Sequence, residues 1–422
     1  MKETPQQAVL RKLFDRIETL GTISSDTPGL TRVFLSKEMD IASRLIQSWM
    51  SNAGLIASVD RMQNVVGSWP AETAHPPAIH IGSHYDTVIN AGKYDGPLGV
   101  LLSIAAVETL RLEGYEPKHP INVAAFCDEE GVRFRSTFLG SSFFCGTFDT
   151  RFLDNVDDAG NSMRSLLELR GFDTSSFNQG TPLIGKDDLF LEAHIEQGPI
   201  LERLNLSLGV VSGIAAQTRI HVTITGESGH AGTTPLDLRR DALTTAAEMI
   251  LAVEASFADN PNARATVGQI KNYPNATNAI PGEVEFMIDL RNPVTAGLNQ
   301  MRDTLLNKLD EIAARRTTEF KAEILQTVDS ITCDSNVQQA LSKALAKHQE
   351  RVTTFTSGAG HDALKIAQTC RTGMMFVRCR NGLSHHPDEY CSPKDIEVAL
   401  AAWVDTLREL DQNFPTPEKA NA

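Results

Sequence analysis

The stretch Ala78-Ile-His-Ile-Gly82-Ser-His84-Tyr-Asp86-Thr-Val88 decides the fold class of this 422-residue chain. It begins as a short apolar run, which predicts a buried strand, and it ends in polar side chains that lie just past that strand. A helix is predicted from about 98 to 112, and a further strand, Ile121 to Phe126, precedes Glu129-Glu130. Strands that alternate with helices form α/β sheets, which build sites beyond the carboxyl ends of their strands. We therefore expect His84 and the two glutamates to meet at one sheet edge.

The chain before this stretch is predicted to be helical from about 5 to 53, with a break near Asp26-Thr-Pro-Gly. Ser36 is a candidate N-cap for the second of these helices. We expect one apolar face on that helix, formed by Ile41, Leu45, Ile46 and Met50. Short strands are expected at 55–59 and 65–69.

The pattern changes after residue 212 to strand, helix, strand, strand, helix, strand, which is the ferredoxin-like order. The second of these helices, near 296–315, carries Leu298, Met301, Leu305, Leu309 and Ile312 at helical spacing. We therefore expect a mixed sheet flanked by helices in a catalytic domain (residues 1–212 and 331–422), with an inserted ferredoxin-like lid or dimerisation domain (residues 213–330).

Composition excludes several classes of protein. The formal net charge of -14 disfavours nucleic-acid binding, which needs clustered Lys and Arg. No uninterrupted apolar run of about 18 residues occurs, and the first residues are polar, so neither a membrane span nor a signal peptide is expected. The six cysteines are scattered without a C-x-x-C pair, which disfavours a disulfide framework. We expect a cytoplasmic protein.

Four short blocks supply the parts of a hydrolytic two-metal site. Such a site needs a bridging carboxylate, terminal His or carboxylate ligands, and a further carboxylate that accepts a proton from water. Asp95, in a Gly-flanked turn, suits the bridge, and Asp86 lies where it could orient the imidazole of His84. In the doublet Glu129-Glu130, one carboxylate can bind metal while the other acts as a base. Each block alone also fits a structural role, as a hydrogen-bonded pair or a solvated loop.

The blocks around His84, Glu129, His194 and His385 occur in an order that resembles the M20-type metallopeptidase and amidase superfamily, in particular its hydantoinase/carbamoylase branch. The resemblance covers nearly the whole chain. It implies that His84 and His194 hold one divalent ion, that Glu130 and His385 hold the other, that Asp95 bridges them and that Glu129 is the general base. Manganese, zinc and cobalt all accept such ligands.

The same resemblance implies a set of residues that bind substrate. In the block His194-Ile-Glu-Gln197-Gly the glutamine faces the substrate. The other implied substrate contacts are Gln217, Asn278, Arg291, Gly358 and Ala359. His230 resembles a histidine that enters the partner subunit's site and stabilises the oxyanion, which implies a homodimer. The structural alternatives are an ion pair at a sheet edge for Arg291, a solvated strand end for Gln217, a turn former for Asn278 and a helix N-cap for His361-Asp362.

The implied reaction is hydrolysis of a linear ureido C–N bond in a small ureido carboxylate, with Glu129 returning the proton to the departing ammonia. The blocks Thr31 to Ser36, Asp128 to Phe134 and Ser136 to Gly140 resemble allantoate amidohydrolases most closely. Allantoate is therefore the expected substrate. The alternatives are an N-carbamoyl-L-amino acid, N-carbamoyl-β-alanine and ureidoglycolate. More remote alternatives are an aminoacylase or dipeptidase, and a metal-stabilised binding module without activity.

Overall fold

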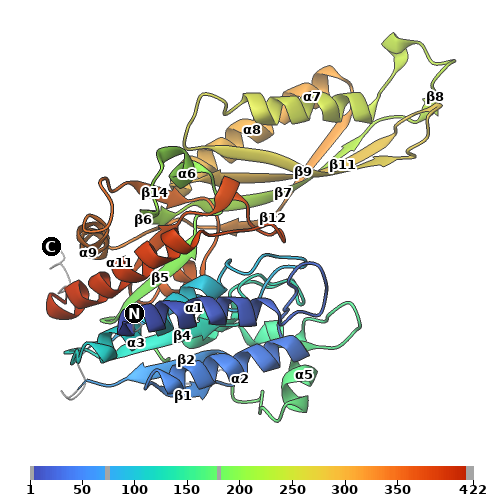
Figure 1. The fold of residues 1–422 in the computed structure, drawn as a ribbon. Coiled ribbons are helices and arrows are strands. Elements are labelled where there is room, and N and C mark those ends of the chain that lie inside the picture. Colours follow the sequence, from blue (N-terminus) through green and yellow to red (C-terminus); the bar gives the residue numbers. More distant parts are fainter. Residues whose placement is uncertain (1–3, 72–76, 178–181, 415–422) are drawn as a thin grey trace, which may run out of the picture. The chain divides into compact units, whose positions relative to one another are not determined.

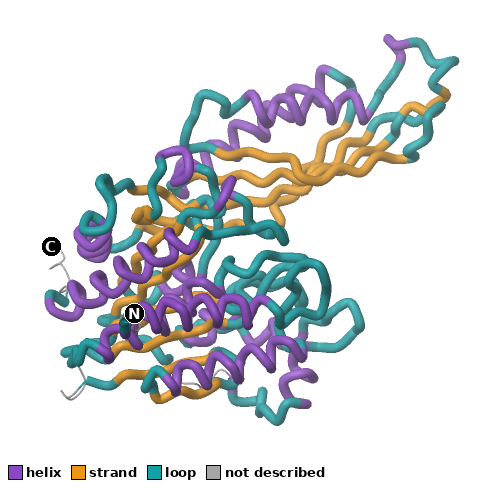
Figure 2. The backbone as a smooth tube through the Cα atoms, in the orientation of Figure 1, coloured by secondary structure: helices purple, strands orange, loops and turns teal. Residues whose placement is uncertain are grey.

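The computed structural model describes residues 4–71, 77–177 and 182–414 of the chain (Figures 1 and 2). Its contacts divide the protein into two compact units. The first contains Met1–Ser212, Cys333–Phe355 and His361–Ala422, and the second contains Gly213–Thr332 and Thr356–Gly360. Gly358 and Ala359 thus belong to the second unit by their contacts, whereas the sequence placed all of 331–422 in the first domain.

The first unit is built on a mixed sheet flanked by helices, which confirms the predicted α/β class. Its strands are β1 (Ile56–Val59), β2 (Val65–Trp69), β3 (Ile79–His84), β4 (Ile121–Phe126), β5 (Leu189–Ile195), β6 (Leu208–Ile214), β14 (Thr354–Ser357) and β15 (Arg371–Val377). The order β1-β2-β4-β3-β5-β15-β6 places β3 beside both β4 and β5. Four neighbouring strands, β4, β3, β5 and β15, run parallel. Their carboxyl ends therefore meet at one edge of the sheet.

Helices pack against this sheet and against one another. They are α1 (Pro5–Gly21), α2 (Lys37–Asn52), α3 (Pro97–Leu112), α4 (Leu139–Phe144), α5 (Met163–Leu169), α6 (Ile200–Leu204), α9 (Ser335–Leu345), α10 (Asp362–Ile366) and α11 (Pro393–Gln412), with the short 3₁₀ turns η1 (Thr150–Asp154) and η4 (Arg380–Gly382). Helix α3 packs on β3, β4 and β5 and is covered by α1 and α11. Its residues 97–110 are all buried, as expected for a helix that is apolar on every side.

The second unit contains a four-stranded antiparallel sheet with two helices on one face (Figure 1). Its elements are β7 (Ala216–Thr225), β8 (Gly229–His230), η3 (Leu236–Leu238), α7 (Ala242–Ala255), β9 (Arg264–Tyr273), β10 (Ala279–Ile280), β11 (Glu283–Asn292), α8 (Thr295–Arg315), β12 (Glu319–Val328) and β13 (Ile331–Thr332). The sheet order is β12-β7-β11-β9. The five apolar residues predicted on α8 are all buried, because their spacing keeps them on the face that packs on β11 and β12.

Two expectations about local structure need correction, although the predicted N-cap is confirmed. Ser36 caps α2 by accepting a hydrogen bond from the N–H of Met39. Ile41, however, is 43% exposed. The buried face of α2 instead consists of Met39, Ala42, Ser43, Ile46 and Met50, which follow the helical period more closely. Strand β5, in the middle of the sheet, was not recognised as a strand from the sequence, because its buried segment includes Glu192 and His194.

All six cysteines are free and buried, as the scattered spacing predicted. In the described part of the chain, no helix is both long enough and apolar enough to span a membrane.

Candidate metal centre and active site

The candidate ligands gather at the sheet edge where the parallel strands end. His84 is the last residue of β3, Glu129 follows β4 and His194 is the next-to-last residue of β5. His385 lies in the segment that connects β15 to α11. Because these strands are parallel neighbours, residues far apart in the sequence lie close in space.

Asp95 lies at the centre of this group, and its two carboxylate oxygens face different ligands. Oδ1 is 3.5 Å from Nε2 of His84 and 3.2 Å from Nε2 of His194. Oδ2 is 3.3 Å from Nε2 of His385, whose Nε2 is also 3.4 Å from Oε1 of Glu130. One carboxylate thus joins two groups of ligand atoms, which is the arrangement that a bridged metal pair requires.

The turn before α3 brings Asp95 close to His84 because residue 96 is glycine. Gly96 has φ +78°, and a Cβ there would lie 2.3 Å from ring atoms of His84. Any side chain at this position would therefore displace the imidazole. The Nδ1 atom of His84 lies 3.1 Å from the backbone carbonyl oxygen of Asp86, so a proton on Nδ1 leaves Nε2 free to coordinate. Nδ1 of His194 similarly lies 3.0 Å from the carbonyl oxygen of Ile195.

Asp86 holds the Glu129-Glu130 loop in place. Its Oδ1 accepts a hydrogen bond from the N–H of Glu129 (3.1 Å), and its Oδ2 accepts one from the N–H of Glu130 (3.2 Å). Its carboxylate is 3.6 Å from Nδ1 of His84, which is longer than the ring's contact with the backbone carbonyl. The contacts of Asp86 are therefore those of a residue that orients both the histidine and the two glutamates.

The charges in the cluster perturb its pKa values strongly. Burial would raise the pKa of Asp95, but the charge of His194 and hydrogen bonds from the three histidines outweigh burial and hold that pKa well below its usual range. Hydrogen bonds to Asp95 and Glu130 raise the pKa of His385 to about 10. Burial raises the pKa of Glu129 well above its usual range, and the nearby charge of His84 opposes this only in part. Asp95 therefore stays ionised, as a ligand must, while the raised pKa of Glu129 suits a group that takes up a proton and returns it.

These residues fit a divalent metal pair. The donor groups His84-Asp95-His194, His84-Glu129-Glu130 and Asp95-Glu130-His385 each have ligand atoms within 4.8 Å of one another. Imidazole and carboxylate donors suit zinc, manganese and cobalt. A further group, Glu192-His194-His361, shares His194 with the first. Glu192 was not a candidate from the sequence.

Metal affinity is expected to rise with pH between about 6 and 8. His385 carries a proton in this range because its pKa is raised to about 10, and a metal ion must displace that proton. Each proton released changes the dissociation constant about tenfold per pH unit. Competition with a chromophoric chelator at pH 6, 7 and 8 measures this slope for Mn(II). His385→Ala should flatten it, whereas the exposed neighbour His386, changed to alanine, should leave it intact. An affinity independent of pH in the unmodified protein would contradict the expectation.

A second set of candidate residues lies together within the second unit. Gln217 of β7 and Arg291 of β11 are paired across the sheet. Asp289 accepts hydrogen bonds from Nε2 of Gln217 (2.5 Å) and from Nε (2.8 Å) and Nη2 (3.2 Å) of Arg291. Nη1 of Arg291 donates to the carbonyl oxygen of Gly358 (2.5 Å). Among the described residues, these bonds use three of the five guanidinium donors and leave two for a ligand.

His230 and Asn278 lie beyond the opposite end of that sheet. Strand β8 pairs with β10 in a separate two-stranded sheet, with His230 opposite Ala279, past the end at which Thr225 of β7 pairs with Glu283 of β11 (β8 in Figure 1). Eight residue steps of about 3.4 Å separate Thr225 from Gln217, so this end is roughly 27 Å from the Arg291 end. Within one chain, a small ligand that contacts Arg291 therefore cannot also contact His230 or Asn278.

Several further polar residues contact the predicted ligands. Nε2 of Gln197 donates to Oδ2 of Asp95 (2.7 Å), which joins this predicted substrate residue to the ligand cluster. Ser384 donates its hydroxyl proton to the same oxygen. His361 lies with its ring centroid 4.5 Å from that of His194, and burial together with the charge of His194 lowers the pKa of His361 well below its usual range. Ser384 has no sequence signal beyond its position before His385.

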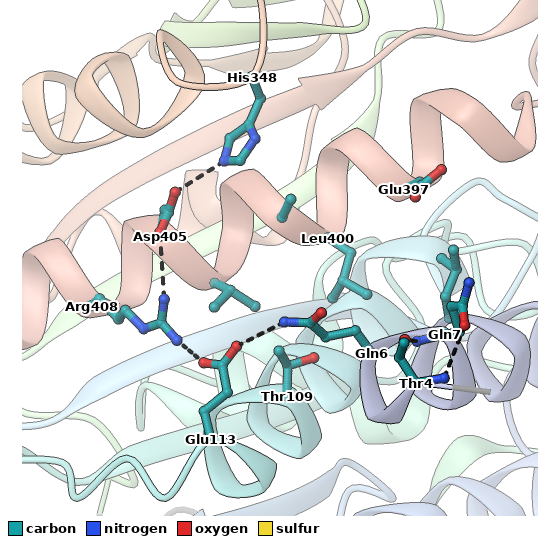
Figure 3. Close-up of a pocket in the computed structure, with 13 residues that line it drawn as sticks. Thr4, Gln6, Gln7, Thr109, Glu113, His348, Glu397, Leu400, Asp405 and Arg408 are labelled. Atoms are coloured by element: carbon teal, nitrogen blue, oxygen red, sulfur yellow. Dashed lines mark hydrogen bonds and ion pairs between the residues drawn. The ribbon is translucent and has the colours of Figure 1, made fainter. Parts of the chain in front are cut away.

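A separate pocket of about 530 Å³ lies between α1, α3 and α11 (Figure 3). Its wall carries a network in which Arg408 contacts Glu113 and Asp405, while His348 lies 3.0 Å from Asp405. None of the candidate metal or substrate residues lines this pocket. The chemistry of the candidate site therefore resides at the sheet edge and not in this pocket.

Comparison with known proteins places this site in a family. The model described as "Peptidase family M20/M25/M40" matches residues 80–409, which include every ligand described above. The chain belongs to peptidase family M20/M25/M40. It is 38% identical over 439 residues to an allantoate deiminase of Arabidopsis thaliana, an alignment that covers 96% of this chain and 83% of that protein.

Two further proteins similar to this M20 family protein come from bacteria. An N-carbamoyl-L-amino-acid amidohydrolase of Pseudomonas sp. (strain NS671) is 38% identical over 396 residues, with coverage of 93% of this chain and 96% of that protein. The crystal structure of an amidase of the hydantoinase/carbamoylase family from Burkholderia multivorans has a TM-score of 0.88 at 32% identity and covers 94% of this chain and 97% of its own. These findings confirm the predicted superfamily, its branch and the class of enzyme.

Proposed function

We propose that this M20 family protein is a metal-dependent amidohydrolase that cleaves a linear ureido C–N bond. The observation that carries this proposal is the orientation of Asp95, whose Oδ1 faces His84 and His194 while its Oδ2 faces His385. One ion would be held by His84, Asp95 and His194, and a second by Asp95, Glu130 and His385. When bound, such a pair supplies an activated water and polarises the carbonyl of the substrate.

Glu129 moves the proton in this mechanism. Its buried carboxylate accepts a proton as water attacks the ureido carbon, and it delivers that proton to the leaving nitrogen when the C–N bond breaks. Ammonia departs, and the carbamate that remains loses carbon dioxide to give the free amine. Asp86 assists by fixing the backbone of Glu129, so that the carboxylate is held in position for both transfers.

Arg291 is proposed to bind the substrate carboxylate. Asp289 already orients the guanidinium, and the two remaining N–H donors suit bidentate recognition of a carboxylate. Gln217 lies beside it, and the backbone of Gly358 and Ala359 would complete the cradle. Gln197 would contact the substrate from the metal centre.

Arg291→Lys is expected to raise KM by about 10–100-fold with a smaller change in kcat. Lysine keeps the charge but loses the planar pair of donors, and charge-assisted hydrogen bonds contribute about 1.5–3 kcal/mol. Arg219→Lys is the matched control, because Arg219 also lies near Asp289, at 3.6 Å, but has no assigned contact with substrate. Steady-state kinetics of both variants distinguish a substrate-binding role of Arg291 from a purely structural one. Equal KM values in the two variants would assign Arg291 to a structural ion pair.

The second unit is proposed to be a ferredoxin-like lid and dimerisation domain. Its β-α-β-β-α-β order and its antiparallel sheet order β12-β7-β11-β9 support this assignment. Since His230 and Asn278 lie beyond the far end of the four-stranded sheet, roughly 27 Å from its Arg291 end, we propose that both residues act in the partner subunit of a homodimer. There His230 would stabilise the developing oxyanion. Six free cysteines support a reducing, cytoplasmic setting.

Allantoate is the proposed substrate, and an N-carbamoyl-L-amino acid is the second candidate. Relatives with each name are equally similar to this chain, at 38% identity. The blocks from Thr31, Asp128 and Ser136 that resemble allantoate amidohydrolases favour the first. Both substrates offer a ureido group together with a carboxylate.

Ammonia release from the Mn-loaded protein should be fastest with allantoate. The assay compares allantoate, N-carbamoyl-L-amino acids, N-carbamoyl-β-alanine and ureidoglycolate at equal concentrations. An N-acetyl amino acid is the amide control, and its hydrolysis is followed by release of the free amino acid because it yields no ammonia. Preference for a carbamoyl amino acid would transfer the assignment to the second candidate. Activity confined to the acetylated compound would replace the ureido reaction by that of an aminoacylase.

A further inference from the structure

Glu389 connects the two loops that carry Asp95 and His385. It lies four residues after His385 and is only 4% exposed. Its Oε1 accepts hydrogen bonds from the N–H groups of Tyr94 (2.8 Å) and Asp95 (3.0 Å). Its Oε2 lies 2.9 Å from the hydroxyl oxygen of Ser384, which also contacts Oδ2 of Asp95. One carboxylate thus fixes the backbone of the bridging residue and the serine that precedes His385.

The backbone around Glu389 is shaped to admit this side chain. A Cβ at residue 92 would lie 2.3 Å from Cβ of Glu389, so glycine there allows the carboxylate to reach the Asp95 turn. The contacts of Glu389 are with two main-chain N–H groups and a hydroxyl, and it belongs to none of the groups of metal-ligand atoms found among the described residues. Its position is therefore that of a residue that acts through Asp95 and not that of a ligand.

We propose that Glu389 is a positioning residue of the metal centre, which orients Oδ2 of Asp95 toward His385 and thereby sets the affinity for the second ion. This inference rests on the metal pair of the proposed function. Residues that orient metal ligands from outside the coordination sphere change metal affinity by about 10–100-fold when they are replaced. Without Glu389, the Asp95 turn and the Ser384-His385 segment lose their shared anchor.

The test is a titration of the full-length protein with Mn(II) alone, followed by electron paramagnetic resonance. Free Mn(II) gives the number and affinity of bound ions, and spin coupling between two bound ions reports that they lie close together and share a bridging ligand. In Glu389→Ala the first ion should bind as in the unmodified protein, whereas the second should bind about 10–100-fold more weakly with loss of the coupled signal. Glu389→Gln should recover most of the affinity, because its amide oxygen can still accept from the two N–H groups.

Asp411→Ala is the matched control for a purely structural role. Asp411 is also a buried carboxylate that accepts two main-chain N–H bonds, from Lys118 and His119, and one hydroxyl bond, from Tyr115. Both alanine variants should lower the melting temperature, but only Glu389→Ala should weaken the second ion. If Glu389→Ala does not fold, Ser384→Ala tests the same connection, because it removes only the hydroxyl between Glu389 and Asp95.

The outcomes separate this inference from the function on which it rests. If the unmodified protein binds two coupled ions and Glu389→Ala or Ser384→Ala binds both with unchanged affinity, the positioning role is wrong while the metal pair stands. If the unmodified protein itself binds fewer than two ions, the proposed metal pair is wrong, and the role of Glu389 is overturned with it. Selective loss of the second ion in the variants supports the role.

Discussion

Replacing Glu129 by glutamine is expected to lower kcat by about 10²–10⁴-fold, the range found for loss of a general acid or base. The amide has nearly the same size as the carboxylate but cannot accept a proton from water or return one to ammonia. The bonds from the loop to Asp86 use main-chain N–H groups, so the variant keeps them. Kinetics together with metal analysis of the same preparation measure the effect, and we expect two ions per chain to remain.

Asp128→Asn provides the matched control for Glu129→Gln. Asp128 is the adjacent residue and is also buried, but it belongs to none of the groups of metal-ligand atoms found among the described residues. This variant should therefore keep kcat within a few-fold of the unmodified protein. A Glu129→Gln variant that binds both ions and keeps more than a tenth of the activity would remove Glu129 from the role of base.

Replacing Asp95 by asparagine is expected to weaken binding of both ions and to lower activity by about 10²–10⁴-fold. Each carboxylate oxygen faces a different ligand group, and the amide nitrogen of asparagine cannot donate an electron pair to a metal ion. Removing one partner from a buried charged cluster costs about 3–5 kcal/mol, which corresponds to the stated range. Isothermal titration with Mn(II) and steady-state kinetics measure the two effects.

Asp188→Asn is the control for this second prediction. Asp188 also lies beside a buried histidine, with Oδ2 3.2 Å from Nε2 of His80, but its hydrogen bond to the N–H of Ala78 places it at the start of β3, away from the ligands. Asp188→Asn should reduce stability and leave metal binding unchanged. Loss of only one ion in Asp95→Asn, with full affinity for the other, would show that Asp95 is a terminal ligand and does not bridge.

The sequence predicted the first unit well where the pattern of nearby residues was sufficient. Alternating strands and helices placed His84 and Glu129 after neighbouring strands, and the structure has both residues at the same edge of the sheet. Helical spacing alone did not identify the buried face of α2, because that face depends on which neighbouring elements the helix contacts. Ile41 was assigned to the buried face of α2, yet Ala42 and Ser43 are buried instead, because the face that packs is set by contact with β1 and β2.

The sequence by itself determined the ligand types, the α/β class and the alternation of strands and helices around His84 and Glu129, because these depend on chemical identity and on backbone periods of two and 3.6 residues. Only the tertiary structure decided that the two oxygens of Asp95 face separate ligand groups and that Glu389 anchors the turn of Tyr94, a residue 295 positions earlier. It also decided that His230 lies beyond the end of the four-stranded sheet that is opposite to Arg291. Such contacts join distant parts of the chain through strand pairing and turn geometry, which leave no periodic trace in the sequence.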